Sequence, residues 1–458
     1  MGKRKQQRDD NIRPLSSRKR DKNIHPHSSG NKELPKEQNV GEGNDIISSL
    51  PENVLHHILS FLSTKDAIRT SILSTKWEYL WTSIANIDLK EKYPLYGKKD
   101  WSFLDFVERV LSLHDASDIK SLRINSYELV NSSHVNSWIS TSIRHNIEEL
   151  NLSLPWKAQV VLPCCLFTCQ SLVVLKLLMN GALNVPSLIQ FSNLKTLELS
   201  ELTFSDDDST QHLFSSCTVL QELALVNCSW ENLKTIVICI PTLKRLTIET
   251  EYMEPPDSED VHSCVTKIYA ANLIHLHFTR CLMVDFRLYD LSSLVDATTI
   301  LFYEDEDVVE EVIIPRVLGL LTAICNVRKL TTTTDAFMGF DVDFSDGTWM
   351  FGRVPSCFSS SLKTVRIAYF DGKRIEIKGF NPYDEDDWMF GRVPSCFATS
   401  LKTVCIEDFD EKPVEMRFIK FLPTNARVLE RLTLRAYLED MQLLKNARVL
   451  DRLTLRTY

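Results

Sequence analysis

The chain contains 458 residues, of which 44% are hydrophobic and 25% are charged, a composition typical of globular proteins. This length predicts two to four domains. The formal net charge of −9 argues against general nucleic-acid binding by the body of the protein. No apolar run approaches the roughly 18 residues of a membrane-spanning helix, and the charged first residues predict no secretory signal.

The first 44 residues are polar and have almost no periodic apolar pattern, which predicts a disordered basic tail. Two basic clusters in this tail are separated by twelve residues: Lys3, Arg4 and Lys5, then Arg18, Lys19 and Arg20. This spacing resembles a bipartite nuclear import signal, and a merely solvated tail is the alternative. The expected localisation is therefore the nucleus, the cytoplasm or both.

The folded part begins with the apolar stretch "LPENVLHHILSFLSTKDAIRTSILSTKWEYLW" at residues 50–81. Pro51 suits the first turn of a helix, and apolar residues then recur at spacings of three and four. Ser63 and Thr75 predict the starts of a second and a third helix. Three helices in so short a stretch cannot bury this much apolar surface among themselves. Either the stretch packs on the rest of the chain or it docks on another protein.

Leu50-Pro51, "HILSFL", "TKDAIRTSILSTKW" and "LW" resemble an F-box, and the resemblance covers residues 45–89. It implies that this segment binds a Skp1-like adaptor, which links it to a cullin–RING ubiquitin ligase. The adaptor-facing positions that the resemblance implies are Leu50, Pro51, Val54, Ile58, Leu59, Ile72, Leu73 and Trp77. Glu78 departs from the family pattern, because plant relatives often carry a basic residue there.

A linker at residues 90–118 contains "WSFLDFVERVLSL" at 101–113, whose apolar spacing predicts an amphipathic helix. From there to residue 340 a unit L-x-x-L-x-L recurs, with steps of 22 to 30 residues between copies. This period is typical of leucine-rich repeats and predicts an irregular, curved solenoid with a parallel sheet on its concave side. The seven copies begin at Ile119, Ile147, Leu172, Leu194, Leu220, Leu243 and Leu273.

The repeat pattern also accounts for some of the twelve cysteines, which all lie at or beyond Cys164. The ninth position of such a repeat prefers Asn or Cys, and Asn180, Cys228 and Cys281 are predicted to occupy it. The densest group, Cys164 to Cys169, lacks the second ligand pair that a zinc site needs, so buried packing thiols are predicted. No metal or other cofactor is expected.

The C-terminal third, residues 341–458, contains two near-identical duplications. "WMFGRVPSCFSSSLKTVRI" at 349–367 returns as "WMFGRVPSCFATSLKTVCI" at 388–406, and "NARVLERLTLRAY" at 425–437 returns as "NARVLDRLTLRTY" at 446–458. The segment resembles the FBD region of a large plant F-box family, with the family position expected at 388–437. The other copies are then expected as added strands or loose ends.

Catalytic motifs are absent: there is no G-x-x-x-x-G-K-[ST], no H-E-x-x-H and no G-x-S-x-G. His56 and His57 have no metal-ligand partners near them in sequence. Acidic stretches at 205–209, 254–260, 304–311 and 384–387 are expected to be solvated loops, with an acidic rim for a basic target as the alternative.

Together these patterns predict an α/β protein made of an F-box, an irregular leucine-rich-repeat solenoid and an FBD-like region. The predicted function is that of a non-enzymatic substrate-recognition subunit of an SCF-type ubiquitin ligase. Its expected partners are a Skp1-like adaptor, a cullin reached through that adaptor and an unknown target protein. Neither a membrane nor a nucleic acid is expected as a partner. The alternative is a nuclear scaffold whose F-box recruits no cullin.

Overall fold

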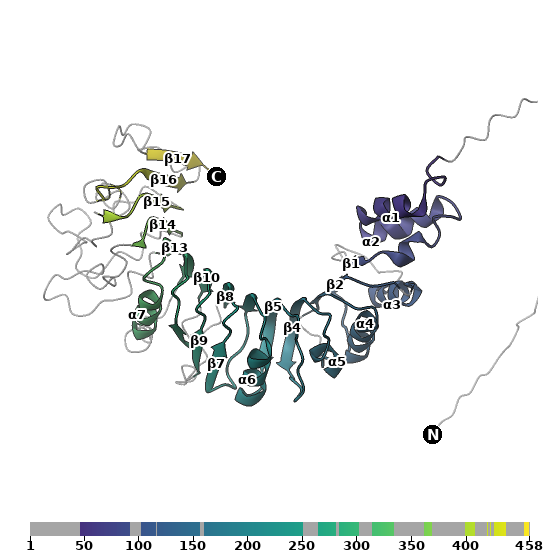
Figure 1. The fold of residues 1–458 in the computed structure, drawn as a ribbon, viewed down its shortest axis with the longest axis horizontal. Helices are drawn as coiled ribbons and strands as arrows, with labels where there is room; N and C mark the ends of the chain where they lie inside the picture. The colour runs from purple at the N-terminus through teal and green to yellow at the C-terminus, as the bar shows by residue number, and fades with distance from the viewer. Residues whose placement is uncertain are drawn as a thin grey trace, which may run out of the picture. The chain divides into compact units, whose positions relative to one another are not determined.

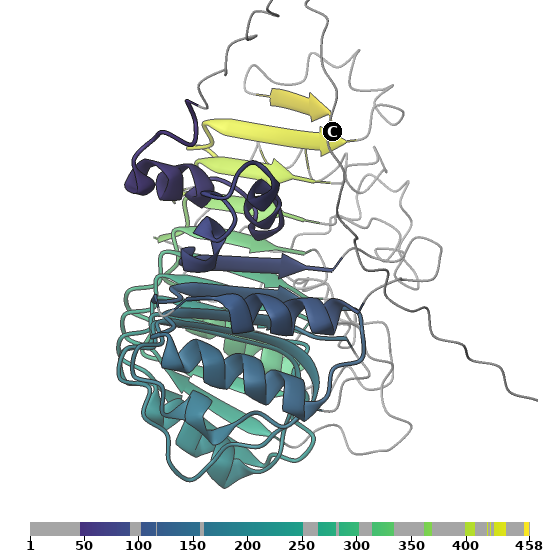
Figure 2. The same cartoon turned by 90° about the vertical axis from the view of Figure 1, so that its right-hand side faces the viewer.

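The computed structural model describes residues 46–91, 102–115, 117–155, 160–250, 264–280, 284–301, 314–333, 361–368, 399–407, 419, 422, 426–436 and 453–457. Its main feature is one long sheet in which every described strand pair is parallel, as the arrows in Figures 1 and 2 show. In spatial order the strands are β1 (Asn86–Lys90), β2 (Ser121–Asn125), β3 (Glu149–Ser153), β4 (Val174–Leu183), β5 (Thr196–Phe204), β6 (Glu222–Val226), β8 (Arg245–Glu249), β10 (His275–Thr279), β12 (Asp296–Ile300), β13 (Lys329–Thr332), β14 (Thr364–Ile367), β15 (Thr403–Ile406), β16 (Arg431–Ala436) and β17 (Leu453–Thr457).

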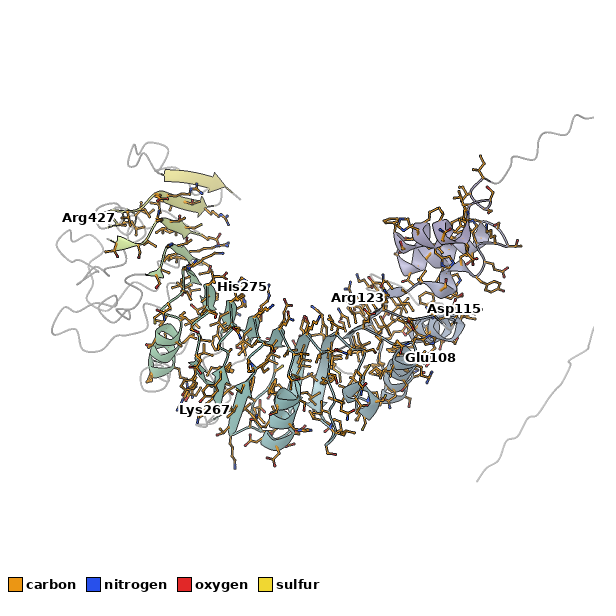
Figure 3. The ribbon with its side chains drawn as sticks, viewed as in Figure 1. Glu108, Asp115, Arg123, Lys267, His275 and Arg427 are labelled. Carbon is orange, nitrogen blue, oxygen red and sulfur yellow. The ribbon has the colours of Figure 1, made fainter. Side chains whose placement is uncertain are left out.

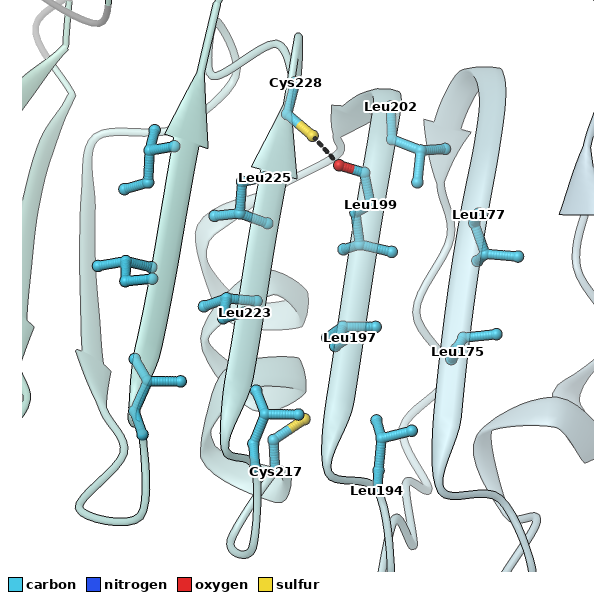
Figure 4. Close-up of a cluster of buried hydrophobic side chains, with 14 of the residues drawn as sticks. Leu175, Leu177, Leu194, Leu197, Leu199, Leu202, Cys217, Leu223, Leu225 and Cys228 are labelled. Carbon is cyan, nitrogen blue, oxygen red and sulfur yellow. Dashed lines mark hydrogen bonds between the residues drawn. The ribbon is translucent and has the colours of Figure 1, made fainter. Parts of the chain in front are cut away.

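The seven predicted repeats are confirmed, because each places one strand in this sheet: β2, β3, β4, β5, β6, β8 and β10. The two later apolar residues of each unit are two positions apart, so both point to the same side of the strand. All three apolar residues of every unit are at most 2% exposed. Figure 4 shows Leu197 and Leu199 beside Leu223 and Leu225 of the next repeat. Each repeat therefore buries its leucines against its neighbours.

The backbone hydrogen bonds at the start of each strand recur as regularly as the leucines. In β5 and β6, the carbonyl of Lys195 accepts hydrogen bonds from the amides of Gln221 (2.8 Å) and Glu222 (2.9 Å). The residue before a strand therefore lies beside the residue before the next strand. This regularity sets the spacing of surface side chains along the edge of the sheet.

The three residues predicted at the ninth repeat position are Cys228, Asn180 and Cys281, and each prediction has a different outcome. The Cys228 thiol donates to the carbonyl of Leu199 in the preceding repeat (3.3 Å), so its structural role is confirmed (Figure 4). Burial raises the pKa of this thiol to about 12. The prediction for Asn180 is wrong, because β4 continues past it to Leu183 after a register shift and pairs with β5 as far as Phe204. Cys281 lies outside the described residues.

One side of the long sheet is covered first by helices and then by a second sheet (Figure 1). The helices are α3 (Phe103–Leu113), α4 (Ser132–Arg144), α5 (Cys164–Phe167) and α6 (Asp207–Ser216). The second sheet is parallel, has the order β11 (Asp285–Tyr289), β9 (Val265–Tyr269), β7 (Thr235–Cys239), and contacts α6 and α7 (Ile314–Ala323). This second sheet was not predicted from the sequence.

Helix α3 confirms the helix predicted at 101–113, although Trp101 lies outside the described residues. Ser102 caps it by accepting from the amide of Asp105, and the carboxylate of Glu128 accepts from the amide of Phe103 (3.1 Å). A carboxylate at a helix N-terminus also interacts favourably with the helix dipole. None of the described helices is long and apolar enough to cross a lipid bilayer.

The duplicated C-terminal segments all contribute strands to the long sheet. In the first pair, each residue of β14 lies opposite its own copy in β15, so that Thr364 pairs with Thr403 and Ile367 with Ile406. In the second pair, β16 and β17 are related in the same way, with Leu432 opposite Leu453. The described parts of the extra copies are therefore added strands, one of the two outcomes expected from the sequence.

Candidate functional site

The segment before the repeats, residues 46–91, is built from short helices with strong local start signals. Helix α1 (Glu52–Ser60) follows Pro51, whose carbonyl accepts from the amides of Val54 and Leu55. Helix α2 (Thr64–Arg69) is capped by Ser63, whose hydroxyl accepts from the amide of Asp66 (3.2 Å) and donates to its carboxylate (2.8 Å). Hydrogen bonds from Ser63 and then from Arg69 lower the pKa of Asp66. Each of these two helices was predicted from its sequence.

The third predicted helix is not α-helical, which corrects the three-helix prediction. Residues 70–72 and 80–83 form 3-10 helices, and the residues between them that include Trp77 form a turn. Trp77 and Trp81 are both buried in this arrangement. A regular helix would also place residues four apart on one face, so the burial of both indole rings does not explain the irregular backbone.

The buried apolar residues of the segment belong to the same continuous core as those of the repeats. Leu55, Leu59, Ala67, Trp77 and Trp81 are at most 6% exposed. This core has one consequence for the predicted adaptor-facing set. Leu59 and Trp77 hold the segment together from inside, and they are not part of its surface in the free chain.

Strand β1 attaches the segment to the long sheet by pairing along its whole length with β2. The hydroxyl of Thr64, at the start of α2, accepts from the amide of Asp88 in β1 (2.8 Å). The carbonyl of Thr82 accepts from the amide of Asp115, which follows α3. The segment therefore ends in the first strand of the sheet, and the predicted boundary at residue 89 falls inside that strand.

Exposed apolar side chains are concentrated in this segment. Among the described residues, eight of the seventeen exposed large hydrophobic side chains lie in residues 46–91. They are Ile46, Ile47, Val54, Phe61, Leu62, Ile72, Leu73 and Tyr79. Ile72 is 88% exposed and Leu73 is 60% exposed, values unusual for aliphatic residues. Exposed apolar side chains are typical of interaction surfaces where they form a contiguous patch.

The structure sorts the predicted adaptor-facing residues by accessibility. Pro51, Val54, Ile72 and Leu73 are exposed, Leu50 and Ile58 are half-buried, and Leu59 and Trp77 are buried. The exposed side chains of Phe61, at the end of α1, and Tyr79, before the second 3-10 helix, were missed. Their sequence signal was only that each is an aromatic residue at the edge of a helical stretch. Adaptor binding at these positions stays a prediction.

Polar contacts around α1 join it to other parts of the F-box segment. The Nδ1 atom of His56 lies 3.0 Å from the hydroxyl of Ser83, and the ring of His57 contacts that of Phe61 edge-on. Lys76 donates from Nζ to the carbonyl of Leu50 (2.7 Å), which ties the start of the segment to its turn. These contacts hold the two ends of the segment together.

The described residues contain no group of three or more His, Cys, Asp and Glu side chains that could hold a metal ion. In the predicted cysteine group Cys169 is buried, Cys165 is half-buried and Cys164 is exposed, so the expectation of buried thiols is wrong for Cys164. In the acidic stretch at 205–209, Asp206 caps α6 by accepting from the amide of Ser209, and this bond lowers the pKa of Asp206. The other three acidic stretches and the basic clusters Lys3–Lys5 and Arg18–Arg20 lie outside the described residues.

A helical segment with exposed apolar side chains, joined to a stack of leucine-rich strands, is the architecture of an F-box protein with repeats. Three family models match the chain in this order. An F-box domain model matches residues 47–87, the model "FBD-associated F-box protein At5g56370, LRR repeats" matches residues 135–284, and an FBD model matches residues 391–434. The FBD match falls within the expected position, 388–437.

Relatives of known sequence agree with the family models. The chain is 31% identical over 294 residues to "F-box/LRR-repeat protein At4g14096" of Arabidopsis thaliana, covering 62% of this chain and 61% of the relative. It is 30% identical over 301 residues to "F-box/LRR-repeat protein At4g14103" of the same plant, covering 62% of this chain and 77% of the relative. "F-box/FBD/LRR-repeat protein At5g56420", also from Arabidopsis thaliana, is 35% identical over 209 residues, covering 44% and 49%. The chain belongs to this family of plant F-box proteins with leucine-rich repeats and an FBD region.

Proposed function

We propose that the chain is the substrate-recognition subunit of an SCF-type ubiquitin ligase. The F-box segment binds a Skp1-like adaptor and through it a cullin, and the repeats with the FBD region bind a target protein. The protein forms and breaks no bond itself. Its contribution is to hold a target lysine near the ubiquitin-charged enzyme, which raises the effective concentration of the two reactants.

The observation that carries the proposal is the exposure of Ile72 and Leu73 in a segment whose Leu55, Leu59 and Trp77 are buried. The exposed side chains are not needed to hold the segment together. Burying two such aliphatic side chains against a partner would contribute about 1.5 to 3 kcal/mol each. The family membership supports the same conclusion, because F-box and repeat proteins of this kind are in general non-catalytic adaptors.

The test is the affinity of the full chain for a plant Skp1-like adaptor, measured by calorimetry, with the double variant Ile72→Asp/Leu73→Asp. Two carboxylates forced against an apolar partner lose their hydration, so we expect affinity to fall by more than about a hundredfold. A matched control is Leu129→Asp/Leu188→Asp, because both leucines are exposed apolar residues outside the F-box segment. The control should bind the adaptor with unchanged affinity.

Each outcome has a defined meaning. No binding by the unaltered chain would overturn the proposal, and so would equal binding by the Ile72→Asp/Leu73→Asp variant. Addition of a cullin then distinguishes the two functions predicted from the sequence, a ligase subunit and a scaffold. A ternary complex supports a ligase subunit, whereas an adaptor complex that excludes the cullin supports a scaffold.

We also propose that the chain enters the nucleus through its two basic clusters, Lys3–Lys5 and Arg18–Arg20. The support is their spacing alone. The test is the nuclear fraction of a fluorescent fusion with all six residues replaced by alanine. An unchanged nuclear fraction would overturn the proposal.

A further inference from the structure

On the face of the long sheet opposite its helices, opposite charges are paired between neighbouring strands from β1 to β12. In each pair a basic side chain on one strand lies beside an acidic side chain on the next, which is the stabilising arrangement for residues that face each other in a sheet. The pairs are Asp88–Arg123 (3.7 Å), Lys176–Glu198 (2.6 Å), Glu222–Arg245 (3.4 Å) and Asp296–His275 (2.8 Å, an ion pair when the histidine is protonated). Figure 3 labels Arg123 and His275 on this face.

Before β13, β14 and β15 cations become neighbours, although Arg366, Lys402 and Arg435 still pair with the carboxylates of Glu407 and Glu430. The residues before β13, β14 and β15 are Arg328, Lys363 and Lys402, and all three are exposed. The carbonyl of Arg328 accepts from the amide of Lys363 (2.8 Å), and the carbonyl of Lys363 accepts from the amide of Lys402 (2.9 Å). The three backbones are therefore about 4.8 Å apart from strand to strand. Like charges at this spacing repel each other.

The next row of residues adds two more exposed cations, Lys329 on β13 and Arg431 on β16. Thr364 and Thr403 lie between them in the same row. Lys402 has an acidic neighbour, because its Nζ contacts the carboxylate of Glu430 (2.5 Å). We call Arg328, Lys329, Lys363, Lys402 and Arg431 the cationic edge. Arg427, labelled in Figure 3, is a further exposed cation four residues before β16.

Equivalent positions carry a larger excess of cations in β13 to β16 than in β2 to β6. The comparison takes the residue before each strand and the first, third and fifth residues from its start. In β2 to β6 these positions carry four cations and four anions, namely Lys120, Arg123, Lys176 and Lys195 against Glu148, Glu149, Glu198 and Glu222. In β13 to β16 they carry seven cations and two anions, namely the cationic edge with Arg366 and Arg435 against Glu407 and Glu430. This excess occurs in a chain of net charge −9.

Two arginines next to the edge are held in place by one buried carboxylate. Arg366 of β14 donates from Nη2 to both oxygens of Glu407 (2.6 Å each), and Arg435 of β16 donates from Nη1 to the same group (2.5 Å). The side chain of Glu407 is only 9% exposed, whereas those of Arg366 and Arg435 are 40% and 32% exposed. The fixed positions of the two guanidinium groups reduce the entropy lost when an anion binds.

We propose that the cationic edge and the Arg366–Arg435 pair bind an acidic, extended segment of a partner protein. The inference rests on the proposed role of the repeats and the FBD region in target binding, and it names the chemistry of the target. The described residues of β13 to β16 include no aromatic side chain, so these four strands themselves offer no platform on which nucleic-acid bases could stack.

The length of the cationic edge indicates how long a bound peptide segment would be. Four strands at a spacing of about 4.8 Å extend over about 14 Å. An extended peptide rises about 3.3 Å per residue, so five residues cover this distance, and alternate side chains point the same way. A segment with Asp or Glu at every second position would therefore place three carboxylates along the edge. A folded acidic surface would not follow the row as closely.

The test is binding of the full chain to a fluorescein-labelled Glu-Ser-Glu-Ser-Glu peptide, measured by anisotropy at low and at physiological salt without adaptor. The variant Arg328→Glu/Lys363→Glu/Arg431→Glu reverses three cations of the edge. The matched control Lys120→Glu/Lys195→Glu/Lys244→Glu reverses three exposed cations in the equivalent row of other strands, with the same change in net charge. We expect at least about a tenfold loss of peptide affinity in the first variant and less than about a threefold loss in the control.

Three results would overturn the inference: no saturable peptide binding by the unaltered chain, equal losses in the two variants, or tighter binding of a single-stranded oligonucleotide that the edge variant also loses. The last result would assign the surface to nucleic acid. The Ile72→Asp/Leu73→Asp variant should keep full peptide binding. Loss of adaptor binding with retained peptide binding, or the reverse, shows which of the two proposals has failed.

Discussion

The repeats and the F-box segment are both rich in large apolar residues, yet they expose them very differently. In the repeats the signature residues of all seven units are at most 2% exposed, whereas Phe61, Ile72 and Leu73 of the F-box segment are at least 60% exposed. A repeat has a neighbour on each side, and stacking covers both of its apolar sides. The F-box segment joins the sheet through β1, and several of its apolar side chains stay exposed. Large apolar residues are therefore fully buried in one region and partly exposed in the other.

The largest expected effect is a core substitution in the repeats. Leu223→Ala in β6 removes a side chain that is 1% exposed and packed between two repeats, so we expect a loss of about 3 kcal/mol in the free energy of unfolding. Ile72→Ala should change it by less than about 0.5 kcal/mol. Urea unfolding followed by circular dichroism measures both. A similar loss in the two variants would show that Ile72 is covered within the chain, and the comparison would fail.

A smaller effect is expected where the two regions join. Thr64→Val keeps the shape of the side chain but removes the acceptor for the amide of Asp88, so we expect a loss of about 1 to 2 kcal/mol. The Asp88 amide should also exchange its hydrogen faster, which hydrogen-exchange mass spectrometry detects. Thr64→Ser keeps the hydroxyl and is the control. Unchanged exchange in Thr64→Val would show that this bond does not hold the F-box segment on the sheet.

Loss of one helix cap is expected to cost about 1 kcal/mol in either region. Ser63→Ala removes the cap of α2 in the F-box segment, and Asn131→Ala removes the cap of α4, which accepts from the amide of His134 (3.1 Å). Ser63→Asp and Asn131→Asp should restore most of the stability. Thermal unfolding of the four variants is the measurement. A negligible effect of Ser63→Ala alone would mean that α2 is held by tertiary packing rather than by its cap.

The smallest perturbation is chemical labelling of the unaltered chain. Burial raises the pKa of Cys217 and Cys228 to about 12, so at pH 8 only about one in ten thousand of these thiols is the reactive thiolate. Cys164 and Cys239 are exposed. Iodoacetamide at pH 8 should therefore label the exposed pair within minutes and the buried pair only in urea, as read by peptide mass spectrometry. Rapid labelling of Cys228 in the folded chain would contradict its place in the repeat core.

Sequence predicted the repeats almost completely, and it predicted the F-box segment only in part. The spacing L-x-x-L-x-L placed all seven strands correctly, because alternation along a strand is a local property. The duplicated segments were recognised, and the structure shows each described copy as a strand opposite its original. In the F-box segment the first two helices were correct, but Trp77 lies in a turn instead of a third helix.

The apolar pattern of the sequence by itself determined which elements form and in what order they stack, because strand period, helix caps and repeat length depend on neighbouring residues. Which apolar side chains stay exposed was decided by the tertiary structure: Leu59 and Trp77 turn inward while Phe61 and Ile72 face outward. The cationic edge is also a tertiary property. Arg328, Lys363 and Lys402 are far apart in sequence, and only the pairing of successive strands brings their charges side by side.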